Sequence, residues 1–420
     1  MVSKGKMLKK LFTIVLLAFQ LTIFAQESRL ADVYYNDGEF EKAATLYKSL
    51  YEKNKQIGLY FQRYTECLLS LKAYKEAEDV IKKEIKSNPG DPQLRLSLAM
   101  VYDRIGDEEK SKAIYKEVID EVGNKPENVD IVARSFTSMN MFEQAAATYE
   151  KATEKSGNPK TYAFSLADLY RRIGNSEKMI HYYLLCAEQF RNNLNYLFDT
   201  FDRYLSEEEI EKLQAKLYEV MEKEPDEIIY NEILQWTFIN QKDYKKGVRQ
   251  ARALDRKLKE NGARGNEIAK VAMQDKDYDT AIEGFKYIVD NKSVNSSYYL
   301  EAKGLLLDCK RKKVTLNYNY TKEDLISLQT EYKTFLDLYG YNSSTVNLVI
   351  EYAELEALYL NDLDVAIGLL KEMVELQSIS PEYRAMAKLK LGDYYLMQAN
   401  QWEATLLYSQ VDKDFKEDRL

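Results

Sequence analysis

The sequence predicts an all-α solenoid of about ten helix-turn-helix repeats. Three observations predict this fold class. Turn-forming residues recur at a fixed interval, an alanine and two aromatic residues follow several of these turns at helical spacing, and prolines are confined to the segments that separate one helix pair from the next. An array of stacked pairs suits a chain of 420 residues, because each pair needs to bury its apolar face only against its neighbours.

The interval between turns is 34 residues. Turn positions fall at 38, 72, 106, 140, 174, 208, 242 and 276, so the spacing repeats seven times in succession. In the clearest copies an aromatic residue stands two positions after the turn, an alanine five positions after it and a second aromatic nine positions after it. These residues are Phe40, Ala43 and Tyr47; Phe142, Ala145 and Tyr149; and Tyr278, Ala281 and Phe285. We expect all of them to lie in the core.

Upstream of the turns the chain repeats a leucine, a small residue and a tyrosine, at relative positions one, two and five. The copies are Leu30, Ala31 and Tyr34; Leu98, Ala99 and Tyr102; Leu166, Ala167 and Tyr170; and Leu391, Gly392 and Tyr395. The small residue allows two helices to approach closely. Period and pattern together resemble the tetratricopeptide repeat, in proteins of the type exported by Bacteroidetes. The resemblance implies a right-handed α-α superhelix with a concave groove lined by the first helix of each pair.

The repeat frame divides the chain after residue 25 into three parts. Residues 26–291 hold eight repeats in the 34-residue register, although the sixth departs from consensus, with a capping box at Ser206 to Glu209 and Lys212 where alanine is usual. Residues 292–344 form an enlarged, irregular pair, because the next turn, Asn361, follows position 276 by two repeats and a further half. Residues 345–420 form two more repeats, the last using Ala399, Ala404 and Tyr408.

The enlarged pair is predicted as helices at about 298–312 and 322–338, joined by a loop from Val314 to Tyr320, with Thr321 capping the second helix. The last pair has no evident segment to shield its apolar face. That face is exposed, or a partner covers it, or the chain is a truncated part of a longer protein, and we favour truncation.

The first 25 residues are predicted to be an export signal. Four lysines precede an apolar run from Leu11 to Ala25, which is short for a membrane span, so a cleaved signal peptide is favoured over an uncleaved anchor. Met7 is an alternative start, because a complete signal follows it. We therefore expect an exported protein, periplasmic or associated with the outer membrane in a Gram-negative bacterium, without a membrane span in the mature chain.

The three cysteines, Cys67, Cys186 and Cys309, are predicted to be free and packed. They lie more than a hundred residues apart, and distant repeats of a solenoid do not bring Cα atoms within the roughly 7 Å that a disulfide needs. The six prolines, Pro89, Pro92, Pro126, Pro159, Pro225 and Pro381, are all placed in linkers between pairs, since proline inside a helix costs about 3 kcal/mol.

The composition argues against several classes of function. A net charge of -8 is unsuited to nucleic acid or to an acidic membrane surface. The single histidine, His181, is expected on an outward face, and the sequence has neither zinc-ligand spacing nor a phosphate-binding glycine loop. Residues 275–279 resemble the start of a calcium loop, but the following glycine is missing and Lys286 stands where a bidentate glutamate belongs. We therefore predict no catalytic, cofactor-binding or metal-binding residue and no enzyme.

The resemblance places five candidate partner-binding residues in the groove: Arg104, Arg134, Arg171, Arg172 and Trp236. Arginines in an acidic protein can bind carboxylates of a partner bidentately. The alternative is that aspartates mapped to the same face, Asp103, Asp130 and Asp168, pair with them. The predicted function is a non-enzymatic scaffold that binds a peptide or protein, and the alternative is a fixed structural subunit of a cell-envelope assembly for secretion, motility or outer-membrane function.

Overall fold

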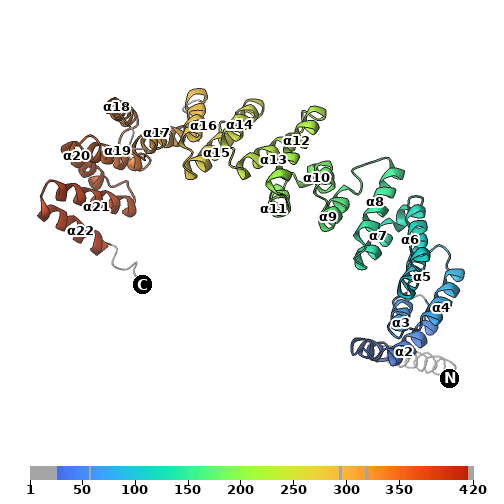
Figure 1. Ribbon diagram of the computed structural model, residues 1–420. Helices are drawn as coiled ribbons and strands as arrows, with labels where there is room; N and C mark the ends of the chain where they lie inside the picture. The colour runs from blue at the N-terminus through green and yellow to red at the C-terminus, as the bar shows by residue number, and fades with distance from the viewer. Residues whose placement is uncertain (1–25, 56–57, 293–295, 317–319, 415–420) are drawn as a thin grey trace, which may run out of the picture. The chain divides into compact units, whose positions relative to one another are not determined.

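The computed structural model describes residues 26–55, 58–292, 296–316 and 320–414, and within these ranges every regular element is a helix. The predicted export signal lies outside them. The chain forms two compact units, residues 1–193 and 194–420, each described here by itself. The all-helical α-α repeat fold predicted from the sequence is confirmed (Figure 1).

The first unit opens with a helical segment at residues 26–36 and continues as a succession of short antiparallel helices. They are α2 (Phe40–Lys53), α3 (Gly58–Ser70), α4 (Tyr74–Ser87), α5 (Pro92–Ile105), α6 (Glu108–Val122), the 3₁₀ helix η1 (Pro126–Asn128), α7 (Val129–Ser138), α8 (Phe142–Ser156), α9 (Ala163–Ile173), α10 (Ser176–Leu185) and η2 (Ala187–Phe190). Each helix packs on the next, and α6 also packs on α8, as expected of stacked pairs.

The second unit continues the same pattern with longer helices toward its end. They are α11 (Leu194–Tyr204), α12 (Glu207–Lys223), α13 (Ile228–Asn240), α14 (Tyr244–Leu258), α15 (Ala263–Gln274), α16 (Tyr278–Asn291), α17 (Tyr299–Leu316), α18 (Lys322–Tyr339), α19 (Val346–Leu358), α20 (Leu363–Glu375), α21 (Pro381–Met397) and α22 (Gln401–Asp414). Here α14 packs on α16 as well as on α15.

Left-handed backbone marks the turns within the helix pairs. Positive φ angles occur at Gly38, Lys72, Gly106, Asn140, Gly174, Lys242, Lys276, Asn361 and Ala399. A residue in this conformation ends the preceding helix. Its own N–H group and that of the next residue donate hydrogen bonds to carbonyl groups in the last turn of that helix. The predicted turn positions therefore coincide with left-handed residues, except position 208. That prediction was wrong: Glu208 lies in the first turn of α12, which Ser206 caps through the predicted capping box.

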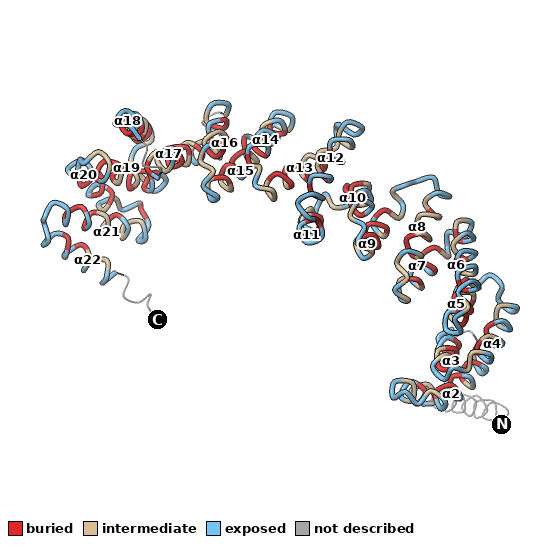
Figure 2. Tube along the Cα trace, in the orientation of Figure 1, coloured by how far each residue is buried: buried red, intermediate tan, exposed pale blue. Residues whose placement is uncertain are grey.

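The small residues lie where helices approach most closely. Ala31, Ala43, Ala99, Ala167 and Ala281 are fully buried, and Figure 2 shows buried residues along the faces where helices meet. A Cβ atom added at Gly392 would lie 2.6 Å from Cε1 of Tyr408, which is closer than carbon atoms tolerate. The small residue of the leucine-small-tyrosine pattern is therefore needed for helix packing, as predicted. Leu98, Leu166 and Leu391 are buried beside it, whereas Leu30 is 43% exposed.

Many tyrosines in this acidic chain end at a carboxylate. Their rings are buried or half-buried, and their hydroxyl groups donate hydrogen bonds to aspartate or glutamate at the edge of the core. The pairs include Tyr35 with Glu66, Tyr47 with Asp32, Tyr64 with Glu76, Tyr102 with Glu78, Tyr115 with Asp103, Tyr149 with Asp130, Tyr170 with Glu150, Tyr244 with Asp275, Tyr287 with Asp255 and Tyr408 with Asp393. These bonds tie helices together at each level of the stack.

Asp255 holds the connection between α14 and α15. Its side chain is 1% exposed, accepts hydrogen bonds from the Gly262 N–H at 2.7 Å and the Tyr287 hydroxyl at 2.8 Å, and pairs with the Lys292 ammonium. Burial alone would raise the pKa of Asp255, but these donors hold it below its ordinary value. A buried carboxylate with three donors stabilises this turn.

The cysteines, His181, two prolines and the enlarged pair can also be compared with their predictions. The three cysteines are buried and free, and His181 is exposed on α10. Pro92 and Pro381 occupy the first turn of α5 and α21 instead of a linker, where the missing N–H costs nothing. In the enlarged pair α17 extends to Leu316, so the loop predicted from Val314 begins later, and residues 317–319 lie outside the described ranges. The repeat boundaries at 26–291, 292–344 and 345–420 stay a prediction.

Candidate functional site

The first unit contains a groove of about 610 Å³ that runs across helices α3, α5 and α7. From α3 it is lined by Gln62, Thr65, Glu66 and Leu69, from α5 by Gln93, Ser97 and Met100, and from α7 by Ser135 and Ser138. Each helix supplies a row of lining residues three or four positions apart, which share one face of that helix: Gln62, Glu66 and Leu69 on α3, Gln93, Ser97 and Met100 on α5, and Ser135 and Ser138 on α7. The groove thus lies over the first helices of three successive pairs.

Most charged groups in the groove are already satisfied. Glu66 accepts hydrogen bonds from Tyr35, Gln62 and Arg63, Glu84 accepts one from Asn88, and Asp91 caps the N-terminus of α5. Each of these carboxylates thus has at least one hydrogen-bond donor within the protein. Their role in the groove is to fix the neighbouring side chains in place.

Uncharged groups remain on the groove floor. The hydroxyls of Ser97 and Ser135 donate to carbonyls of their own helices, at 2.9 and 2.8 Å, so each oxygen keeps lone pairs for an incoming N–H group. Met100 adds a deformable apolar surface beside them, and Leu59 at the rim is 53% exposed. Alternating polar and apolar contacts of this kind suit the backbone and side chains of an extended polypeptide.

The arginines predicted for the groove lie elsewhere in the first unit. Arg104, at the end of α5, and Arg134, on α7, are exposed and do not line the groove. Arg171 and Arg172, at the end of α9, both bind the Asp168 carboxylate, at 2.5 and 2.8 Å, as in the alternative of internal pairing.

The other two aspartates behave differently. The carboxylates of Asp103 and Asp130 accept hydrogen bonds from Tyr115 and Tyr149, at 2.6 and 3.1 Å, and Arg134 donates from Nε to the backbone carbonyl of Asp130 at 3.2 Å. Sequence reasoning missed this because a tyrosine on a core position gives no sign of where its hydroxyl ends.

Trp236 belongs to the second unit, where its ring stacks on Phe198 with centroids 5.2 Å apart and parallel planes. It also contacts Phe201. The residue is therefore half-buried among aromatic rings of α11 and α13. The binding role of all five predicted residues stays a prediction.

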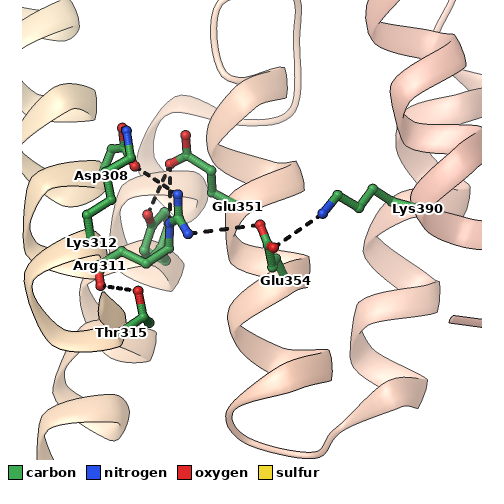
Figure 3. Close-up of polar contacts among 8 residues, drawn as sticks. Asp308, Arg311, Lys312, Thr315, Glu351, Glu354 and Lys390 are labelled. Atoms are coloured by element: carbon green, nitrogen blue, oxygen red, sulfur yellow. Dashed lines mark hydrogen bonds and ion pairs between the residues drawn. The ribbon is translucent and has the colours of Figure 1, made fainter. Parts of the chain in front are cut away.

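A cluster of charged side chains lies partly buried between α17, α19 and α21 of the second unit (Figure 3). Arg311 is its centre: it donates to Asp308 at 2.9 Å and lies 4.0 Å from Glu351 and 3.9 Å from Glu354. Lys312 binds Asp308 at 2.7 Å, and Lys390 of α21 reaches Glu354 at 3.2 Å. The cluster thus connects three helices by ion pairs.

Glu351 is the least well compensated member of this cluster. Its side chain is 18% exposed, its nearest cationic nitrogen is 4.0 Å away, and the Tyr332 hydroxyl donates to it at 3.2 Å. Burial first, and then the Asp308 carboxylate, raise the pKa of Glu351 to about 7 against the opposing effect of Arg311. Glu351 therefore changes its charge near neutral pH.

Potential metal ligands do not gather among the described residues: no group of three or more histidine, cysteine, aspartate or glutamate side chains could hold an ion. At the sequence that resembled a calcium loop, Asp279 pairs with the Lys313 ammonium. No described helix has the length and apolar character needed to cross a membrane.

Comparison with known families identifies tetratricopeptide repeats in the first unit. Models of this repeat match residues 28–92, 92–121 and 161–193. These matches support the tetratricopeptide repeat family, and they include α3 and α5, two of the three helices that line the groove. No curated protein sequence matches the chain.

Solved structures resemble the chain in fold only. They include yeast Tom70, with 13% identity, a TM-score of 0.31, and coverage of 93% of this chain and 99% of that one. The P58(IPK) TPR domain has 13% identity and a TM-score of 0.24, at 93% and 99% coverage. The structure of Naa15/Naa10 bound to HypK-THB has 12% identity and a TM-score of 0.27. The match spans 93% of this chain but only 63% of that one.

Proposed function

We propose that this protein is a non-enzymatic protein-protein interaction scaffold that binds an extended segment of a partner in the α3-α5-α7 groove. The observation that carries the proposal is the groove itself, about 610 Å³ in volume and lined on three successive first helices mainly by uncharged polar and apolar groups, with Glu66 as the charged exception. The tetratricopeptide matches over α3 and α5 support it, and no catalytic family is among the matches.

The proposed location is outside the cytoplasm, in the periplasm or at the outer membrane of a Gram-negative bacterium. The basic and apolar pattern of residues 1–25 supports export. The N-terminal sequence of the protein recovered from an envelope fraction tests this. An N-terminus at Gln26 is expected, and recovery of the intact leader from the cytosol would contradict it.

The groove is tested with peptides selected from a random displayed library on the purified protein. Ser97→Trp places a bulky ring in the groove, whereas Lys116→Trp places the same ring on the exposed face of α6. Selected peptides should lose at least about tenfold in affinity with Ser97→Trp, because the ring occupies their site, and almost nothing with Lys116→Trp. Equal affinity for both variants would refute the groove.

The arginine prediction is tested by the double change Arg134→Glu and Arg171→Glu with the same peptides. If these arginines extend the binding surface, acidic peptides lose affinity. Because Arg171→Glu also breaks the ion pair with Asp168, the single change Arg134→Glu is measured beside the double change, and it should weaken acidic peptides without lowering the melting temperature. If affinity does not change, the arginines play no part and binding is confined to the three-helix groove.

A second candidate function, a fixed subunit of an envelope assembly, is favoured by one surface of the second unit. Helices α21 and α22 expose large apolar side chains: Met386, Leu389, Leu396, Met397, Trp402 and Leu406, with Trp402 81% exposed. Exposed apolar groups gathered on two adjacent helices are typical of contact surfaces. Light scattering after size exclusion separates the two functions, because an obligate subunit should not behave as a clean monomer.

A further inference from the structure

A second cavity, also of about 610 Å³, lies in the second unit between helices α18, α19 and α20. Its walls come from α18 and α20, and its floor comes from α19. The lining residues are Gln329, Thr330, Lys333, Thr334, Asp337, Tyr341, Tyr352, Glu356, Val365 and Leu369, with Leu336 behind them. We call this cavity the α18-α20 cleft.

The cleft lies between the second helices of two successive pairs, α18 and α20. Helix α18 packs on α17 and α19, and α20 packs on α19 and α21. The first helix of the later pair, α19, therefore carries both walls and forms the base between them.

Glu356 lies at the floor of this cleft, fully buried at 0% exposure. One carboxylate oxygen accepts a hydrogen bond from the Gln329 amide at 2.8 Å. The other, Oε2, accepts no hydrogen bond of good geometry from a described protein group, although the Tyr352 hydroxyl lies close enough for burial and this carboxylate to raise the pKa of Tyr352. A buried carboxylate oxygen without a donor is costly, so a ligand that supplies a donor gains that energy on binding.

The other cleft residues favour a cation as that ligand. Asp337 adds a second carboxylate at the exposed rim, and the rings of Tyr341 and Tyr352 line the path between rim and floor. Aromatic faces attract cations, and desolvation at the floor strengthens the attraction. One exposed lysine of the cleft, Lys333, opposes cation binding, because its ammonium would compete with an incoming cation for the carboxylates.

We propose that the α18-α20 cleft binds a basic side chain, lysine or arginine, of a partner polypeptide, with Glu356 accepting its charged hydrogen bond at the floor and Asp337 contacting it at the rim. The chain carries a net charge of -8, which complements a basic partner. The cleft lies in the second unit, so this proposal does not depend on the groove of the first unit, and either can fail without the other.

The probe is the peptide acetyl-Gly-Arg-Gly-amide, titrated into the full chain by calorimetry, with the citrulline peptide as its uncharged control of the same shape. The arginine peptide should bind at about millimolar affinity, as expected for a single anchored side chain, and at least about tenfold more tightly than the citrulline peptide. A lysine peptide should also bind. The proposal would be overturned by equal binding of the charged and uncharged peptides. It would also be overturned if neither peptide binds at a concentration about ten times the expected millimolar dissociation constant.

Three variants locate the binding. Glu356→Gln should weaken the arginine peptide about tenfold, while Glu323→Gln, an exposed glutamate on α18 outside the cleft, should not change it. Lys333→Gln should strengthen binding, because it removes the competing ammonium. A folded Glu356→Gln protein that retains full affinity would overturn the proposal.

Because Glu356 is buried, Glu356→Gln can affect folding. Asp337→Asn, at the exposed rim, is therefore tested as a second variant. This change should weaken binding severalfold without altering the melting temperature. If Glu356→Gln does not fold, unchanged affinity in both Asp337→Asn and Lys333→Gln overturns the proposal.

Discussion

Replacing Glu351 by glutamine should stabilise the second unit at pH 8 and leave it almost unchanged at pH 4. The amide has the shape of the protonated carboxyl group but never carries charge. In the native protein the carboxylate form is disfavoured by burial and by the nearby Asp308, while Arg311 compensates only in part from 4.0 Å. The variant removes this conflict.

The magnitude follows from the shift of one pKa. The pKa of Glu351 rises from 4.5 to about 7 on folding, and each pKa unit corresponds to about 1.4 kcal/mol, so the penalty is about 3 kcal/mol. The folded state binds the proton more tightly than the unfolded state. The contribution of Glu351 to stability is therefore fully present below pH 4.5, falls as the pH rises, and is lost above about pH 7.

Hydrogen exchange measured by mass spectrometry is the suitable assay, because a repeat array need not unfold in one step. Peptides from α17 and α19 are compared between variant and native protein at the same pH, so the intrinsic exchange rate cancels. Protection should rise up to about a hundredfold at pH 8 and stay nearly equal at pH 4. The reasoning is refuted if the two proteins agree at both pH values, or if the variant is less protected at pH 8.

Glu354→Gln is the matched control. Glu354 lies one helical turn away and pairs with Lys390 at 3.2 Å, within the same cluster. Its loss removes an ion pair instead of an uncompensated charge, so this variant should not gain protection at pH 8. A gain in both variants would mean that general relief of negative charge, and not the position of Glu351, explains the effect.

The remaining predictions concern packing and one buried carboxylate. Ala43→Glu should lower the free energy of unfolding by about 3 kcal/mol or more, because it buries an unpaired charge between helices. Glu41→Ala, on the exposed face, should change it by no more than about 0.5 kcal/mol. Similar melting temperatures for the two variants would mean that the register is wrong. Gly392→Ala should lower stability in thermal melts by about 1–3 kcal/mol, because the added Cβ would lie 2.6 Å from the Tyr408 ring. Gly368→Ala, which has open space around its Cβ, should raise stability by about 0.5–1 kcal/mol. Asp255→Asn should cost about 3 kcal/mol at pH 7 in chemical denaturation. Because the pKa of Asp255 is lowered on folding, its contribution is present above the unfolded pKa and lost as the pH falls through the folded one, so a difference that persists undiminished at pH 2 would contradict the assignment.

The regular features of the fold could be predicted from the sequence because they depend on local rules. The turns at Gly38 and Asn140 need left-handed backbone, and glycine and asparagine adopt it most readily. Ala43 and Gly392 had to be small because two helices meet there. Glu208 was misplaced because the interval was extended through a repeat whose capping serine starts its helix earlier.

The candidate sites could not be predicted in the same way. The groove residues Ser97 and Ser135 are chemically inconspicuous, and only the helical spacing within α5 and α7 could have suggested a common face. The α18-α20 cleft depends on the separation of two helices, which no residue pattern encodes. In the sequence, Glu351 and Glu356 do not differ from other charged positions. The burial of their carboxylates results from side chains that come from three other helices.

The tyrosine-carboxylate bonds set an upper pH limit for the fold. Burial first, and then the acceptor carboxylate, raise the pKa of Tyr244 and of Tyr408 to about 12. A phenol in the unfolded chain ionises near pH 10. The stability that these phenols supply is therefore complete below pH 10 and disappears as the pH approaches 12. Since such bonds recur in both units, ionisation of the phenols removes hydrogen bonds between helices in several pairs as the pH rises above 10, and the helix content of both units should fall in strong alkali.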